Sequence, residues 1–186
     1  MVHIIKPTLS VETVFEDCIS TFTDTALVTR LQSVSTHIQN ETNNYDALAL
    51  TNGIYQINST TMVNGIVTKD DMVKVYEQKL VPKKAVGRSH YEYLRSLAKH
   101  NICPLCNQRT VSTLDHVLGK SDYPTFAVSP INLIPACIDC NKIKSASYNP
   151  DSSEEEILHP YYDDISNEQY LVAIVNEESP ASIILI

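Results

Sequence analysis

Four of the five cysteines stand in two Cys-x-x-C pairs, Cys103/Cys106 and Cys137/Cys140. Thiolates in such pairs are common zinc ligands, because a tight turn places two sulfur atoms at the angle that a tetrahedral ion prefers. In a reducing compartment, two matched pairs favour a metal over disulfides. The 30 residues between the pairs leave room for two strands and a loop. The sequence therefore predicts a structural Zn²⁺ site on which this module depends to fold. The fifth cysteine, Cys18, lies in an apolar helical pattern and is expected to be a small buried side chain.

Polar side chains of a second kind lie between and beside these cysteines. Asp115 and His116 are adjacent, Asn132 follows, and Asn141 comes directly after the last cysteine. An imidazole with an ordinary pKa of about 6.5 can accept a proton from water at neutral pH. Carboxylate and amide oxygens suit Mg²⁺ or Mn²⁺ better than zinc. Neighbours on a strand point to opposite faces, so we expect a bend or bulge that brings both Asp115 and His116 to one site.

The order D-H, N-L and C-x-x-C-N-x-x-K resembles the HNH endonuclease family, whose fold is the ββα-metal (His-Me) finger. Here it stands at residues 114–118, 131–134 and 137–144. The resemblance covers about 45 residues firmly. It extends more loosely to the helix that begins at Gly87-Arg88 and to His159-Pro-Tyr-Tyr. Gly119 is a departure, because many relatives carry proline there.

The resemblance implies a role for each polar residue. His116 would be the general base, and Asp115 and Asn141 would hold the catalytic Mg²⁺ or Mn²⁺. Asn132 would support the loop and orient the His116 ring. The other histidines are expected to be structural or exposed: His3, His37, His90, His100 and His159.

The formal net charge of −8 is unevenly distributed. Residues 82–150 carry nine Lys/Arg against four Asp/Glu, residues 1–81 carry five against nine, and residues 151–186 carry none against nine. Positive charge is thus concentrated around the motif, where it would attract the phosphates of DNA. The candidates for phosphate contacts are Lys144, Lys142, Lys120 and Arg109.

The expected fold class is α+β, with a helical N-terminal region, a finger with its four-cysteine zinc site, and a short C-terminal segment that contains a strand. The predicted division is residues 1–81 as a helical scaffold or docking region, 82–150 as the HNH nuclease module and 151–186 as an acidic segment. Ser10 and Thr68 are expected to cap helices, the second of them ending before Pro82. Further predictions are a helix around 26–38, a turn at 39–45, a helix over 89–99, strands over 111–118 and 131–134, a helix over 136–146 and a strand over 171–175.

These features predict a metal-dependent endonuclease that hydrolyses DNA to 5′-phosphate and 3′-hydroxyl ends. The wider resemblance is to stand-alone bacterial HNH proteins that act beside an ATPase in anti-phage defence, as in Septu-like and retron-associated systems. One module cuts one strand, so a double-strand break would require a homo-oligomer or two successive events. Two alternatives stay open: a zinc-stabilised DNA-binding or assembly module without catalysis, and an HNH nuclease that cuts RNA. No apolar run approaches about 20 residues and no signal peptide is evident, so we expect a cytoplasmic protein without a membrane partner.

Overall fold

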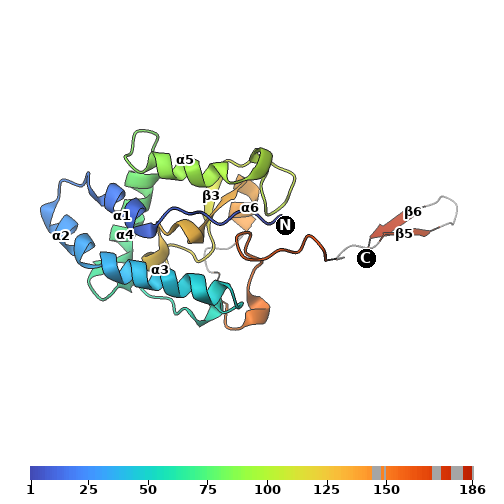
Figure 1. The fold of residues 1–186 in the computed structure, drawn as a ribbon, viewed down its shortest axis with the longest axis horizontal. Helices are drawn as coiled ribbons and strands as arrows, with labels where there is room; N and C mark the ends of the chain where they lie inside the picture. The colour runs from blue at the N-terminus through green and yellow to red at the C-terminus, as the bar shows by residue number, and fades with distance from the viewer. Residues whose placement is uncertain (144–147, 149, 169–172, 177–181, 186) are drawn as a thin grey trace.

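The computed structural model describes residues 1–143, 148, 150–168, 173–176 and 182–185. It has the predicted mixture of helices and short strands (Figure 1). The helices are α1 (Val11–Ile19), α2 (Thr25–Ser33), α3 (Ser35–Ala49), α4 (Lys69–Lys74), the π-helix η2 (Val75–Leu80), α5 (Arg88–Ser96), α6 (Ile138–Ile143) and the 3-10 turns η1 (Ile54–Gln56), η3 (Lys99–Asn101), η4 (Pro124–Phe126), η5 (Pro130–Asn132) and η6 (Ser153–Glu155). The strands are β1 (Met62–Val63), β2 (Val67–Thr68), β3 (Thr113–His116), β4 (Leu133–Ala136), β5 (Ala173–Asn176) and β6 (Ser182–Leu185).

Both predicted helix caps are confirmed. The Ser10 hydroxyl accepts a hydrogen bond from the Thr13 amide at 3.1 Å, and the Thr68 hydroxyl accepts one from the Asp71 amide at 3.2 Å. Each bond satisfies an amide that the first helical turn leaves without a partner. The helix capped by Thr68 continues from α4 into the π-helix η2 and ends at Leu80, before Pro82.

The predicted turn at residues 39–45 is wrong, because α3 runs without interruption from Ser35 to Ala49. Its buried side chains, Ile38, Thr42, Tyr45 and Ala49, recur at steps of three and four residues. The polar residues between them lie on the outer face, as they do in any helix that packs on a core. Polar composition alone therefore gave the wrong structure for this segment. The change of direction lies at Val34, between α2 and α3.

The centre of the fold is an antiparallel pair of strands, β3 and β4, followed directly by α6. Asp115 pairs with Ile134 and His116 pairs with Leu133. The four successive pairs contain no bulge, so the expected bulge does not occur within β3. The chain bends instead at residues 117–118, directly after His116. Strand β4 begins later than predicted because η5 occupies residues 130–132. The predicted helix over 136–146 corresponds to α6 as far as Ile143, and residues 144–146 lie outside the described part.

The N-terminal helices and the central strands share one hydrophobic core. Leu114 and Leu133 of the strands pack with buried side chains of α1, α2, α4 and α5. Figure 1 shows the strand pair between α5 on one side and α3 on the other. From α5, the Tyr91 hydroxyl accepts a hydrogen bond from the Leu114 amide at 3.3 Å. The helices thus form part of the support for the strand that carries Asp115 and His116.

The segment around residue 160 contacts strand β4 and the turn before it. The Tyr161 hydroxyl donates to the Leu133 carbonyl at 2.8 Å. The buried His159 ring lies 3.2 Å from the Ile131 carbonyl and 3.1 Å from the Tyr45 hydroxyl. His159 is therefore structural, within the prediction of a structural or exposed residue, and it ties α3 to η5, the turn before β4.

Further along the chain, β5 pairs with β6 in an antiparallel hairpin. The predicted strand over 171–175 is confirmed for residues 173–175, and residues 171–172 lie outside the described part. None of the helices in the described residues has the length and apolar character needed to cross a membrane.

Candidate functional site

The four cysteines of the two pairs converge on one point. Their Sγ atoms all lie within 4.8 Å of one another, and the Cys106 and Cys137 sulfurs are 4.0 Å apart. Four sulfurs bound to Zn²⁺ at about 2.3 Å stand about 3.8 Å apart in a regular tetrahedron. The cluster has nearly that size before any ion is placed in it. These four thiols form a site that could hold a structural zinc ion.

Local structure at each pair directs the sulfurs inward. The Cys103 amide donates to the Arg109 carbonyl at 2.7 Å, and the Asn107 amide donates to the Cys103 carbonyl at 2.8 Å. These bonds close a tight turn in which Asn107 has a positive φ of 52°, a conformation that asparagine tolerates better than most residues. The second pair lies where β4 passes into α6, and the Cys140 amide points to the Cys137 sulfur at 3.5 Å.

The surroundings shift the pKa values of three of the four thiols, and not all in the same direction. Burial raises the pKa of Cys103 and Cys140 above the ordinary thiol value. Burial also opposes ionisation of Cys106, but the backbone amides of Arg109 and Gln108 lower the pKa of that thiol to about 7. A cation at the centre would favour the thiolate form of all four, because metal binding releases thiol protons.

His116 ends strand β3 and is 8% exposed. Its Nε2 atom donates a hydrogen bond to the Ala127 carbonyl at 2.9 Å. A carbonyl oxygen only accepts, so this bond assigns the proton of the neutral ring to Nε2 and makes Nδ1 the basic nitrogen. The geometry therefore fixes both the orientation and the tautomer of the imidazole.

Asn132 is fully buried and joins the two ends of the loop that follows His116. Its Oδ1 accepts from the Leu118 amide at 2.8 Å, and its Nδ2 donates to the carbonyls of Leu118 and Phe126 at 3.0 and 3.1 Å. The Asn132 side chain thus supports the loop. The His116 ring, by contrast, is oriented by Ala127, the residue that follows Phe126.

Asp115 and Asn141 lie on the two elements that meet beside His116. Asp115 is on β3 and is 5% exposed. Asn141 is on α6, and its Nδ2 points to the Leu114 carbonyl on β3 at 3.4 Å. Because the amide nitrogen is turned toward the strand, Oδ1 is the atom that remains for a cation. One carboxylate and one carboxamide oxygen are ligands that a hard divalent cation accepts.

Tyr76 is a residue of this region that the sequence analysis missed. It lies in the π-helix η2, and its ring is 4.5 Å from the His116 ring, centroid to centroid, at an interplanar angle of 64°. Burial, with the nearby charges of Tyr91 and Asp115, raises the pKa of the Tyr76 phenol. Tyr76 therefore contacts His116 and lies within reach of the charge of Asp115. A π-helical turn often marks functional positions, but this one is seen only in the structure, and no pattern in the sequence pointed to Tyr76.

The basic candidates have different surroundings. Lys120 lies 3.7 Å from a carboxylate oxygen of Glu77, with its ammonium group 5.5 Å from the centre of the Tyr76 ring. Arg109 forms an ion pair with Asp139, which links the two cysteine pairs across the surface. Lys142 is exposed on α6, and Lys144 lies outside the described residues. Of these candidates, Lys120 is the one that the described contacts bring next to the His116 region.

Cys18 and four of the remaining histidines lie elsewhere in the fold. Cys18 is fully buried, as expected, and burial, with the charge of Asp17, raises the pKa of its thiol to about 12. His90 is 2.6 Å from an Asp17 carboxylate oxygen. His3 and His100 are exposed, and His37 lines a cavity on α3.

Comparison with known proteins gives a similarity in sequence to a phage protein. Protein ea31 of Escherichia phage lambda is 33% identical to the chain over 132 residues. The similarity covers 69% of this chain but 44% of the phage protein, so the chain spans less than half the length of that relative. No known family profile matches the chain, and no solved structure matches it.

Proposed function

We propose that the chain is an HNH-type endonuclease that hydrolyses phosphodiester bonds of DNA with a divalent cation and His116 as the general base. The observation that carries the proposal is the fixed ring of His116, which ends the strand next to α6. Its Nε2 donates to the Ala127 carbonyl at 2.9 Å. A ring held in one tautomer is what proton abstraction from water requires. Strands β3 and β4 with helix α6 would then form the ββα-metal finger, stabilised by zinc at the four cysteines.

In this proposal each residue has a separate task. Nδ1 of His116 takes the proton of the attacking water. Asp115 and Asn141 would hold Mg²⁺ or Mn²⁺, and the ion would supply positive charge beside the phosphate and the leaving 3′ oxygen. Asn132 keeps the loop closed, so that the Ala127 carbonyl stays where the His116 ring needs it.

Positive charge next to the base supports a polyanionic substrate. Lys120 lies against Tyr76, whose ring contacts His116, and the nearby Glu77 holds it at 3.7 Å. A partly exposed pair at that distance contributes little to stability, so a phosphate could replace Glu77 at small cost. Lys142 and Lys144 follow Asn141 on the same segment and would extend the contact along the strand.

The biological setting is a separate part of the proposal. We propose a cytoplasmic nuclease that acts with an ATPase in anti-phage defence, with a homo-oligomer for double-strand cleavage. The name of the phage lambda relative states no activity, so it supports neither this setting nor another. Co-purification of the tagged chain with the products of its neighbouring genes tests the partner.

The catalytic test is plasmid nicking by the zinc-loaded protein with Mg²⁺ or Mn²⁺ in the buffer. We expect His116→Ala to lower the rate by about a hundredfold or more, the usual value of a general base. Asn141→Ala should weaken the dependence on cation concentration. His3→Ala serves as the control, because His3 is exposed and outside the site.

The alternatives predict different results. Nicking that His116→Ala leaves unchanged would refute the assignment of the base. DNA binding without cleavage by the wild type, at any concentration of either cation, would favour a zinc-stabilised binding or assembly module. Faster digestion of tRNA than of plasmid in parallel reactions would make RNA the substrate.

A further inference from the structure

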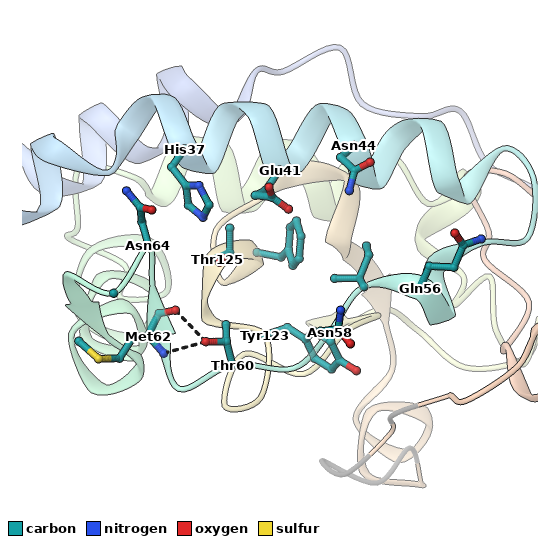
Figure 2. A pocket seen from close by; sticks show the side chains of 13 residues that line it. His37, Glu41, Asn44, Gln56, Asn58, Thr60, Met62, Asn64, Tyr123 and Thr125 are labelled. Atoms are coloured by element: carbon teal, nitrogen blue, oxygen red, sulfur yellow. Dashed lines mark hydrogen bonds between the residues drawn. The ribbon is translucent and has the colours of Figure 1, made fainter.

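A cavity of about 440 Å³ opens on the face of α3 that looks toward η4 and the loop before β1. Figure 2 shows His37, Glu41 and Asn44 projecting from α3 into this space, with Thr125 at its centre. Asn58 and Thr60 close the opposite side. Its volume is within the range of small-molecule sites, which is roughly 300 to 1,000 Å³. Three segments that are distant in the sequence meet here.

Five of the polar side chains around the cavity have no hydrogen-bond partner among the residues that the structure describes. Within the described part of the chain, the side chains of His37, Glu41, Asn44, Asn58 and Thr125 make no hydrogen bond to another residue. Thr125 is only 5% exposed, yet Figure 2 places its side chain in the cavity. Asn44 and Asn58 are exposed, and His37 and Glu41 are half-buried, so a ligand in the cavity could replace the water that these groups bind.

The chemistry of the lining indicates which ligand it would take. Among the described residues, no lysine or arginine lines the cavity, and Glu41 is the one carboxylate that does. A phosphate would therefore be repelled, whereas an amino group would be attracted. Carboxamides such as Asn44 and Asn58 each offer a donor and an acceptor side by side, which matches the edge of a nucleobase. Ile57 and Phe126 add apolar surface for the flat face of a base.

We propose that this cavity binds a nucleobase that carries an exocyclic amino group: adenine, cytosine or guanine. The inference rests on the proposed function, which makes a nucleic acid strand the source of the base. In this arrangement the Glu41 carboxylate accepts a hydrogen bond from the amino group, and the carboxamides bind the neighbouring ring positions.

The cavity is linked to the His116 site through one short turn. Thr125 and Phe126 line the cavity, the Phe126 carbonyl accepts from Asn132, and the next residue, Ala127, holds the His116 ring. Lys120, on the same loop, would meet a phosphate of the strand outside the cavity. An unpaired base in the cavity would thus place its own strand along the loop that positions His116.

The test is an amide chemical-shift titration of the ¹⁵N-labelled, zinc-loaded full chain with cytidine, adenosine, thymidine and ribose, and then with a short single-stranded oligonucleotide. We expect cytidine and adenosine to shift the amides of His37, Glu41, Asn44 and Thr125, and thymidine to bind more weakly. Asn44→Ala should weaken binding about fivefold to tenfold, the value of one hydrogen bond. Asn43→Ala is a matched control, because Asn43 is the adjacent residue on α3 and lines a different cavity.

The titration can support or overturn the proposed base-binding site. No shift at these amides with any nucleoside or oligonucleotide would overturn it, and so would equal shifts with ribose. Thymidine binding as tightly as cytidine would remove the role of Glu41 in selecting amino-bearing bases. An oligonucleotide that binds more tightly than nucleosides identifies a strand as the source, whereas nucleoside binding alone identifies a free nucleoside. Base binding without plasmid nicking would refute the nuclease and keep the cavity assignment, and nicking without base binding would do the reverse.

Discussion

Replacement of Asn132 tests how the loop beside His116 is held. The Asn132 side chain is fully buried and makes three hydrogen bonds, one from the Leu118 amide and two to the carbonyls of Leu118 and Phe126. Each such bond contributes about 1 kcal/mol, and each orphaned partner here stays out of water. Asn132→Ala should therefore lower the free energy of unfolding by about 3 kcal/mol. For a chain of this length that corresponds to a fall in Tm of roughly 6–12 °C.

Asn132→Asp is the sharper variant because it keeps the shape of the side chain. It replaces the amide donor with a carboxylate oxygen that faces two carbonyls, so we expect a loss of about 3–5 kcal/mol near neutral pH. Urea unfolding of the zinc-loaded protein measures both variants. The control is Asn141→Ala, which removes one long contact of 3.4 Å and should cost about 0.5 kcal/mol. If Asn132→Asp were as stable as the wild type, the side chain would not support the loop as described.

Three further predictions concern the zinc cluster, the aromatic contact and a buried carboxylate. Removal of zinc by a chelator, or Cys106→Ser, should lower Tm by about 10 °C or more, and added Zn²⁺ should restore only the chelated wild type. Tyr76→Phe keeps the ring against His116 and should leave nicking within about threefold, whereas Tyr76→Ala should lower it about tenfold or more, with unchanged zinc content as the control. Desolvation opposes ionisation of Asp71, but hydrogen bonds from Lys74, Thr68 and Arg30 lower its pKa below 3.8. Its contribution to stability is therefore present above about pH 4 and is lost as the pH falls through the lowered value. Urea unfolding should show Asp71→Asn less stable than the wild type at pH 7 by about 1 kcal/mol, with a smaller difference as the pH falls below about 4. A constant difference at all pH values would contradict this.

Local signals predicted much of the architecture. The caps at Ser10 and Thr68 act within three residues of themselves, so a short stretch of sequence contains all that they need. The same is true of the Cys-x-x-C turns, in which spacing and turn residues already direct two sulfurs to one side. The order of strand, strand and helix from the first cysteine pair to the second followed from such short patterns. The turn predicted at residues 39–45 failed for the opposite reason, since burial against the core, not local polarity, keeps α3 continuous.

The sequence by itself determined which residues could do chemistry: four thiols for a metal, His116 for a proton, Asp115 and Asn141 for a cation. The tertiary structure decided what surrounds them. Tyr76 reaches the His116 ring from forty residues away, and the cavity on α3 is assembled from three separate segments. No local pattern encodes such contacts, because they arise only when apolar faces distant in the chain bury one another and bring their polar neighbours together.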